Sequence, residues 1–154
     1  MNTKRSAGIL LHPTSLPGKY GIGDLGNEAY KFVGFMVESG QSLWQVFPLG
    51  PTGYGDSPYQ CFSAFAGNPL LISPDKLYEQ GLLTKKDMNN LREWDSHKID
   101  FGAVIPYKTE LLKSAFGNFT KQNKNIYAEY GSFISTNNDW IEDFALFMAV
   151  NLKH

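Results

Sequence analysis

Two compact apolar runs enclose an amphipathic segment in the first fifty residues. Residues 8–11 and 43–47 are short runs of mainly apolar side chains, which predict two buried strands. Residues 27–39 between them carry apolar side chains at helical spacing, with Asn27 as the expected N-cap and Gly40 placed to end the helix. Strand, helix and strand predict a βαβ unit with parallel strands and a right-handed crossover.

The pattern beyond residue 69 is mainly helical. Residues 70–72 are expected to form a short strand or an extended segment. A short helix should open at residues 73–75, where a proline occupies the first helical position, and another at the capping-box sequence 84–87. Three longer helices are predicted over residues 106–116, 126–134 and from 140 onward. The sequence therefore predicts an α/β beginning followed by a helical portion.

Residues 48–69, here called the glycine-rich loop, follow the second predicted strand. The loop is rich in glycine and proline, and it holds four aromatic residues: Tyr54, Tyr59, Phe62 and Phe65. Aromatic residues argue against disorder, and a long loop inside a compact domain usually has a function. We expect exposed rings that cover the faces of a neutral polyhydroxylated ligand, with Asp56, Ser57 and Gln60 bonding its hydroxyls. The alternative is a structural loop whose aromatic rings fill the core.

The parallel strands would place two loops at one end of the molecule. His12 follows the first strand, and the glycine-rich loop follows the second. In α/β folds the ligand site lies beyond the carboxyl ends of the strands. His12 could therefore face a site or be a hydrogen-bonded loop histidine.

Composition excludes several classes of protein. The 154 residues carry a net charge of −1 and a pI near 6.3, which gives no electrostatic basis for binding nucleic acid or an anionic membrane. Cys61 is the only cysteine, so it has no partner for an internal disulfide and is expected to be a small buried filler. No stretch has the length of a membrane span, and no metal-ligand spacing joins the three histidines. We expect a soluble cytoplasmic protein without metal or cofactor.

One short motif suggests a different function, the binding of a dinucleotide. Residues 21–26 read G-x-G-x-x-G and precede a predicted helix, which on paper is a dinucleotide-binding fingerprint. That fingerprint belongs directly after the first strand and requires an acidic residue about 20 positions on, and both features are missing here. The glycines are better interpreted as shaping the loop that enters the helix. Residues 50–57 likewise lack the lysine of a phosphate-binding loop.

Three long blocks, in order, resemble a known family. Residues 8–18 (GILLHPTSLPG), 44–51 (WQVFPLGP) and 53–69 (GYGDSPYQCFSAFAGNP) are similar to the amylomaltases, the 4-α-glucanotransferases of glycoside hydrolase family 77. Residues 140–147 (WIEDFALF) add a weaker match. Ordered blocks of this length are far more specific than a short motif.

The resemblance implies a fold that this chain only begins. The family has a (β/α)8 barrel with insertions, and such a barrel takes about 250 residues. Residues 1–72 would then form the first βαβ part of an α/β TIM barrel, and residues 73–154 a mainly helical inserted subdomain. The apolar pattern of the last helix continues to the final residue. We therefore expect an incomplete barrel and a truncated chain.

The resemblance also implies an activity. The complete enzyme would transfer α-1,4-glucan segments between maltodextrins with retention, through a covalent glucosyl-enzyme and without a cofactor. Its partners would be maltooligosaccharides and, for this chain, the remainder of the barrel. By position in the matched block, Ser57 and Tyr59 are expected donor-side sugar contacts and Tyr54 a stacking residue, whereas Asp56 would shape the loop.

The catalytic carboxylates of the family come from later barrel strands, so the resemblance places none in this chain. A retaining mechanism needs two carboxyl groups about 5–5.5 Å apart. From the residues alone, Asp24 and Asp56 could be considered as such a pair, because both lie in loops at the same end. The resemblance speaks against that pair and predicts that the chain is inactive alone. A non-catalytic maltodextrin-binding module and a purely structural fragment remain as alternatives.

Overall fold

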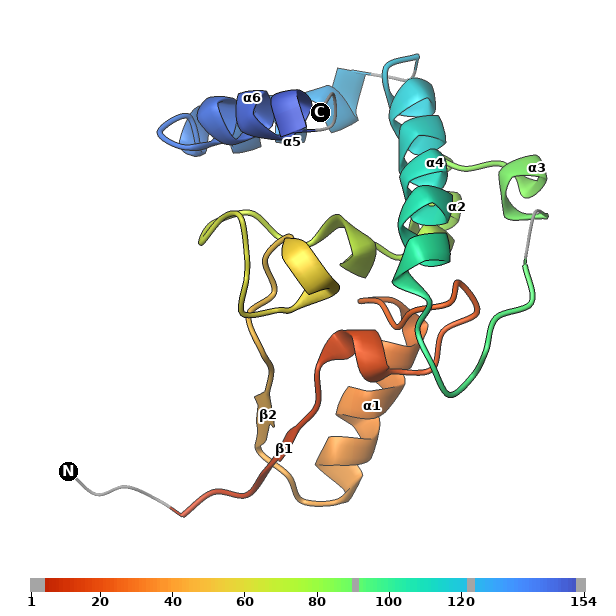
Figure 1. Cartoon of the computed structure of the whole chain (residues 1–154), viewed down its shortest axis with the longest axis vertical. Coiled ribbons are helices and arrows are strands. Elements are labelled where there is room, and N and C mark those ends of the chain that lie inside the picture. The colour runs from red at the N-terminus through yellow and green to blue at the C-terminus, as the bar shows by residue number, and fades with distance from the viewer. Residues whose placement is uncertain (1–4, 90–91, 122–123, 152–154) are drawn as a thin grey trace.

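Two short parallel strands joined through a helix open the molecule. The computed structural model describes residues 5–89, 92–121 and 124–151. Strands β1 (Gly8–Leu10) and β2 (Leu43–Gln45) pair in parallel, with Gly8 opposite Leu43 and Leu10 opposite Gln45. Helix α1 (Asn27–Glu38) lies beside them (Figure 1). The predicted parallel pair is confirmed, although each strand is shorter than its apolar run.

Helix α1 is fixed at both ends by glycine and packs against β2. Gly26, and not Asn27 as predicted, occupies the N-cap position, where no side chain bonds the free N–H groups. At the other end Gly40 adopts φ +68°, a left-handed conformation that ends the helix as expected. The rings of Phe32 and Trp44 meet edge to face with centroids 5.0 Å apart, and the Trp44 indole N–H donates to the Leu11 carbonyl at 2.7 Å. The helix is thereby held against the strand end.

The remaining elements are helical. Three 3-10 turns, η1 (Pro13–Ser15), η2 (Tyr54–Asp56) and η3 (Pro69–Leu71), lie in the loops. In the part of the chain that the structure describes, five helices follow: α2 (Pro74–Glu79), α3 (Lys85–Met88), α4 (Phe101–Phe119), α5 (Lys124–Thr136) and α6 (Ile141–Asn151). The expectation of a strand or extended segment at residues 70–72 is wrong over 70–71, which belong to η3. Asn68 caps that turn by accepting from the Leu70 N–H at 2.9 Å, and a proline begins it.

Helix α4 begins earlier than predicted. Its N-cap is Asp100, whose carboxylate accepts from the Ala103 N–H at 3.2 Å. Pro106, expected to be the first residue, therefore lies inside the helix. A proline inside a helix removes one backbone hydrogen bond, so pattern reading places the start at the proline. Here the Asp100 cap and the burial of Val104 sustain the turn before it.

Helix α4 joins two small apolar cores. One contains Leu82, Leu83, Leu111 and Ala115, and the other contains Ile22, Leu70 and Val104. Because α4 contributes to both, it ties the loops around the strands to helices α2 and α3. Phe116, near the end of the helix, is 60% exposed. Lys108 lies on the buried side of the helix, between Val104 and Leu111, and is fully buried.

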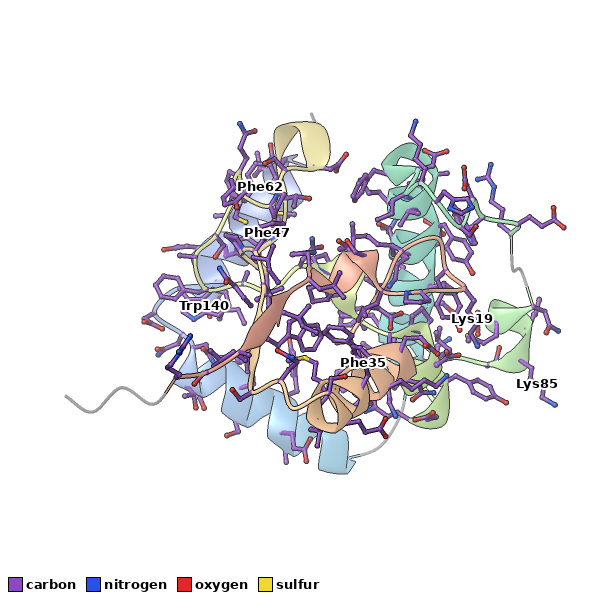
Figure 2. The ribbon with its side chains drawn as sticks, turned by 90° about the horizontal axis from the view of Figure 1, so that it is seen from below. Lys19, Phe35, Phe47, Phe62, Lys85 and Trp140 are labelled. Atoms are coloured by element: carbon purple, nitrogen blue, oxygen red, sulfur yellow. The ribbon has the colours of Figure 1, made fainter. Side chains whose placement is uncertain are left out.

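Large apolar side chains remain exposed on the strands and on α1. Leu10 and Leu43 in the strands are each more than half exposed, as are Phe35 and Val37 on α1. Figure 2 shows Phe35 on this helix, away from the loops at the strand ends. Within the part of the chain that the structure describes, no helix combines the length and apolar character needed to cross a membrane.

Candidate functional site

Three aromatic rings follow one another at the carboxyl ends of β1 and β2. His12 and Phe47 each lie two residues beyond the paired residues Leu10 and Gln45. Their ring centroids are 6.0 Å apart with an interplanar angle of 21°, and the Tyr59 ring lies 5.5 Å from that of Phe47. Tyr59 is the outermost ring and is 71% exposed. The strand ends therefore support an exposed ring that solvent and ligands can reach.

His12 forms the inner end of this stack. Its Nδ1 lies 2.7 Å from the Thr14 hydroxyl and also accepts weakly from the Thr14 N–H. Nδ1 is therefore the acceptor nitrogen, and in the neutral ring Nε2 carries the proton. Nε2 is buried. Burial lowers the pKa of His12, and the Pro48 carbonyl partly opposes this shift, so a neutral imidazole is favoured at neutral pH.

The glycine-rich loop is ordered by bonds between its two arms. The Gly53 N–H donates to the Gln60 carbonyl at 2.8 Å, and the Phe62 N–H donates to the Pro51 carbonyl at 3.0 Å. Cys61 is half-buried, not the buried filler expected, and its thiol donates to the Pro58 carbonyl at 2.9 Å. The prediction of an ordered loop is confirmed.

Three aromatic rings of this loop, those of Tyr59, Phe62 and Phe65, do not fill the core. Tyr59 and Phe65 are each more than 70% exposed, and Phe62 is 46% exposed. Figure 2 shows Phe47 and Phe62 on the same side of the molecule as Trp140, opposite Lys19 and Lys85. The loop thus presents its rings outward, as the functional interpretation requires.

Two left-handed residues bring Ser57 next to Tyr59. Gly55 and Asp56 have φ values of +69° and +54°, a conformation that aspartate adopts more readily than most residues. After this turn the Ser57 hydroxyl oxygen accepts from the Tyr59 N–H at 3.3 Å, which leaves its O–H free to donate. The backbone of Tyr54 starts η2, whereas its side chain lies outside the described part of the structure. Asp56 accordingly sits where it shapes the loop.

Asp24, in the loop after β1, is held in a network of its own. One carboxylate oxygen accepts from the Gly26 N–H at 2.9 Å, and the other lies 3.7 Å from the Lys108 ammonium. Burial raises the pKa of Asp24, and the Lys108 charge partly offsets this. Its contacts are those of a residue that fixes the entry to α1.

The side chain of Lys108 extends from α4 to the loop that holds Asp24. This lysine was not identified from the sequence as a candidate residue. Its ammonium donates to the carbonyls of Leu70 and Ile72 at 2.7 and 2.8 Å, in addition to the pairing with Asp24. Burial lowers the pKa of Lys108 to about 8, partly opposed by the Asp24 charge. The sequence feature that could have identified Lys108 is its position within an apolar stripe of the helix, where a charged residue is unexpected.

Phe47 was also missed as a site residue, because it was assigned to the end of the second strand. The strand register could have identified it, since His12 and Phe47 lie at equal offsets beyond a paired position. Side chains at equal offsets in neighbouring parallel strands stand side by side.

The glycine motif at residues 21–26 packs against protein. Gly21 has φ +78°, and a side chain there would lie 2.5 Å from the Trp94 ring. This conformation and this contact explain the glycine without a nucleotide. Across residues 5–89, 92–121 and 124–151, no three His, Cys, Asp or Glu side chains gather as a metal site would require.

The fold and the stack define a class: an α/β protein with a candidate ligand site at the carboxyl ends of parallel strands. A family model described as 4-alpha-glucanotransferase, glycoside hydrolase family 77, matches residues 11–154. The chain belongs to this family, and the resemblance seen in its three sequence blocks is confirmed.

Individual members of the family are also similar to this chain. The 4-alpha-glucanotransferases of Synechocystis sp. and Thermus thermophilus are each 46% identical over all of this chain. The structure of the amylomaltase from Streptococcus agalactiae in complex with acarbose matches 97% of the chain with a TM-score of 0.90 and 42% identity. The chain spans only 31%, 30% and 30% of these three proteins, respectively.

Proposed function

We propose that this chain is part of a 4-α-glucanotransferase that transfers α-1,4-glucan segments between maltodextrins. The observation that carries the proposal is the exposed Tyr59 ring, which lies against Phe47 at the strand ends, while the Ser57 hydroxyl accepts from the Tyr59 backbone N–H. An aromatic face next to a free hydroxyl donor suits the C–H face and the hydroxyls of a glucose unit. Membership of the family supports the reaction, and the acarbose bound by the Streptococcus protein supports an oligosaccharide ligand.

In this proposal the chain supplies part of the substrate-binding wall. Ser57 and Tyr59 contact the donor sugar, and Tyr54 stacks on the glucan. Residues 1–72 begin the catalytic barrel, and residues 73–154 form a helical insertion. The Lys108 and Gly26 contacts of Asp24 support a structural role for this carboxylate, so we assign the nucleophile and the acid/base to the remainder of the barrel.

The test is disproportionation of maltotriose, with products resolved by chain length. We expect no turnover by the 154-residue chain, and glucose plus longer maltodextrins from a polypeptide that also carries the rest of the barrel. Activity of the 154-residue chain would overturn the assignment of the carboxylates and direct attention to Asp24 and Asp56. Lack of activity in a folded longer polypeptide would contradict the proposed reaction.

A non-catalytic maltodextrin-binding module is the second candidate, favoured by the exposure of Tyr59 in this chain by itself. Calorimetric titration with maltoheptaose distinguishes the two. Saturable binding by the 154-residue chain that is lost in Tyr59→Ala, together with an inactive longer polypeptide, would establish the binding module in place of the transferase.

A further inference from the structure

The segment that carries His12 is fixed to the sheet by two hydrogen bonds. The Leu11 N–H donates to the Gln45 carbonyl at 3.0 Å, which continues the parallel pairing beyond Leu10. The Leu11 carbonyl in turn accepts from the Trp44 indole N–H at 2.7 Å. The backbone of His12 therefore begins at a point that β2 holds in place, and its ring can support other groups.

Two different segments engage the ring of His12. Nδ1 accepts from the hydroxyl and the backbone N–H of Thr14, which fixes the ring relative to η1. The Pro48 carbonyl acts on the ring as a hydrogen-bond acceptor from the start of the glycine-rich loop. Because Nδ1 is engaged with Thr14, the Nε2–H is the group that can donate to this carbonyl. With Nδ1 engaged and Nε2 buried, neither nitrogen is available to move a substrate proton.

The face of the His12 ring leads to Tyr59 through Phe47. The rings of His12 and Phe47 are stacked, with centroids 6.0 Å apart, and the ring of Tyr59 is tilted against that of Phe47 at 5.5 Å. Phe47 lies just beyond β2, in a segment that belongs to no helix or strand. The strand pairing therefore does not hold Phe47, and its position depends on side chains beside it. A shift of Phe47 would displace Tyr59 as well.

A local role for His12 has to be weighed against this arrangement. His12 is the N-cap residue of η1, because its side chain accepts from the Thr14 N–H. Serine, aspartate or asparagine would serve that purpose equally well. The contacts with Phe47 and with the Pro48 carbonyl use features that those residues lack, namely an aromatic face and a second ring nitrogen. These two contacts connect the loop after β1 to the loop after β2.

We propose that His12 is a positioning residue: it holds Phe47 and the start of the glycine-rich loop so that Phe47 sets the ring of Tyr59 against the donor sugar. His12 itself does not touch the sugar. The inference rests on the proposed function in taking Tyr59 as a sugar contact. It adds a residue of the loop after β1 to the machinery that orients the substrate.

The experiment measures the position of Tyr59 in the longer polypeptide that carries the rest of the barrel. Fluorotyrosine is incorporated, and the fluorine NMR signal of Tyr59 is assigned by its absence in Tyr59→Phe. Without sugar, we expect His12→Ala to shift and broaden this signal, and Thr14→Val to move it in the same direction by less. His97→Ala is the matched control, because this histidine is exposed between α3 and α4 and should leave the signal unchanged.

Titration with acarbose, the ligand of the Streptococcus protein, supplies a double-variant cycle. His12→Ala should weaken binding about three- to ten-fold, the range of one aromatic pair, and should cause no further loss in a Tyr59→Ala background. Losses that multiply would show that His12 does not act through Tyr59. A Tyr59 signal that does not move in His12→Ala would also overturn the proposal. So would unfolding of both His12→Ala and Thr14→Val, observed by circular dichroism, because His12 would then be a structural residue.

The proposed function and the positioning role fail in different ways. The fluorine signal is recorded without sugar, so it decides the role of His12 whether or not the polypeptide is active. A native polypeptide that does not disproportionate maltotriose contradicts the proposed function alone. An active polypeptide whose Tyr59 signal ignores His12→Ala contradicts the positioning role alone.

Discussion

Tyr59 and Lys108 both belong to the region around the strand ends, but solvent reaches only one of them. Tyr59 is 71% exposed, and its ring is tilted against that of Phe47 with centroids 5.5 Å apart. Lys108 is fully buried. Its ammonium group donates to two backbone carbonyls and forms an ion pair with one carboxylate. Substitution of Tyr59 should therefore weaken ligand binding, and substitution of Lys108 should change the stability of the fold.

Tyr59→Ala should impair sugar handling without unfolding the protein. In the longer polypeptide that carries the rest of the barrel, we expect disproportionation of maltotriose to fall about ten-fold or more, because a stacking face worth about 1.4 kcal/mol is lost. The free energy of unfolding should fall by about 1 kcal/mol at most, the value of one exposed ring pair. Tyr59→Phe keeps the ring and serves as the control. A large drop in the melting temperature of Tyr59→Ala would identify Tyr59 as a core residue.

The buried Lys108 predicts an unusual pH dependence of stability. Its pKa is about 8 in the folded state, below the ordinary 10.5 of the unfolded chain. Between these values the unfolded state binds more protons, so the contribution of Lys108 to the free energy of unfolding rises with pH, by at most about 1.4 kcal/mol per pH unit. Burial raises the pKa values of Tyr20 and Tyr107, so their opposing contributions begin near pH 10. Urea unfolding between pH 7.5 and 9.5 therefore measures the contribution of Lys108 to the free energy of unfolding without that of the two tyrosines.

Lys108→Met removes the titrating group and supplies the comparison. We expect the stability difference between native chain and Lys108→Met to increase in favour of the native chain as the pH rises through this window. Lys113→Met, on the exposed side of the same helix, should follow the native chain at every pH. A difference that stays flat or decreases with pH would show that Lys108 is not desolvated in the folded state.

At the scale of elements, local hydrogen bonds decide where helices begin and end. The capping box of α3 was predicted from sequence and is confirmed: the Thr84 hydroxyl accepts from the Asp87 N–H, and the Asp87 carboxylate accepts from the Thr84 N–H at 2.8 Å. Gly40 and Gly81 end α1 and α2 in left-handed conformations. Such signals involve residues within a few positions of one another, so the sequence displays them.

Thr84→Ala should destabilise the α3 region by about 1 kcal/mol, because it removes the side-chain half of the capping box. Hydrogen bonds from Thr84 and Ser114 lower the pKa of Asp87, so its stabilising contribution is present above pH 4 and is lost as the pH falls through the lowered value. In Thr84→Ala that pKa should rise, as measured by NMR titration of the Asp87 carboxyl carbon. Thr136→Ala, at an exposed site at the end of α5, is the control. An unchanged pKa would refute the capping role.

At the scale of the whole molecule, the two-stranded sheet is poorly covered by other parts of the chain. The strands expose Leu10 and Leu43, and a sheet of two strands has marginal stability without further packing. We expect the amides of β1 and β2 to exchange with deuterium much faster than those in the middle of α4, whose buried side joins both cores. Adding the rest of the barrel should slow the strand amides selectively. Strong protection of β1 and β2 in the isolated 154-residue chain would show that this chain is already a complete folding unit.

The sequence by itself determined the features that depend on neighbouring residues or on long ordered blocks. These are the parallel βαβ beginning, the ordered glycine-rich loop, the caps of the short helices and the family. The outward position of the Tyr59, Phe62 and Phe65 rings was one of two alternatives, between which the structure decided. The roles of Tyr54, Ser57 and Tyr59 in sugar binding stay predictions.

Only the tertiary structure decided which distant residues meet. It joined His12, Phe47 and Tyr59 into one stack, placed Lys108 of α4 against Asp24, and turned the expected extended segment after Asn68 into η3. It also stacked the ring of Phe65 on that of Trp140. The physical reason is that these contacts join residues many positions apart, and their energy comes from packing and desolvation in the assembled fold. No periodicity or local hydrogen bond in the chain encodes that pairing.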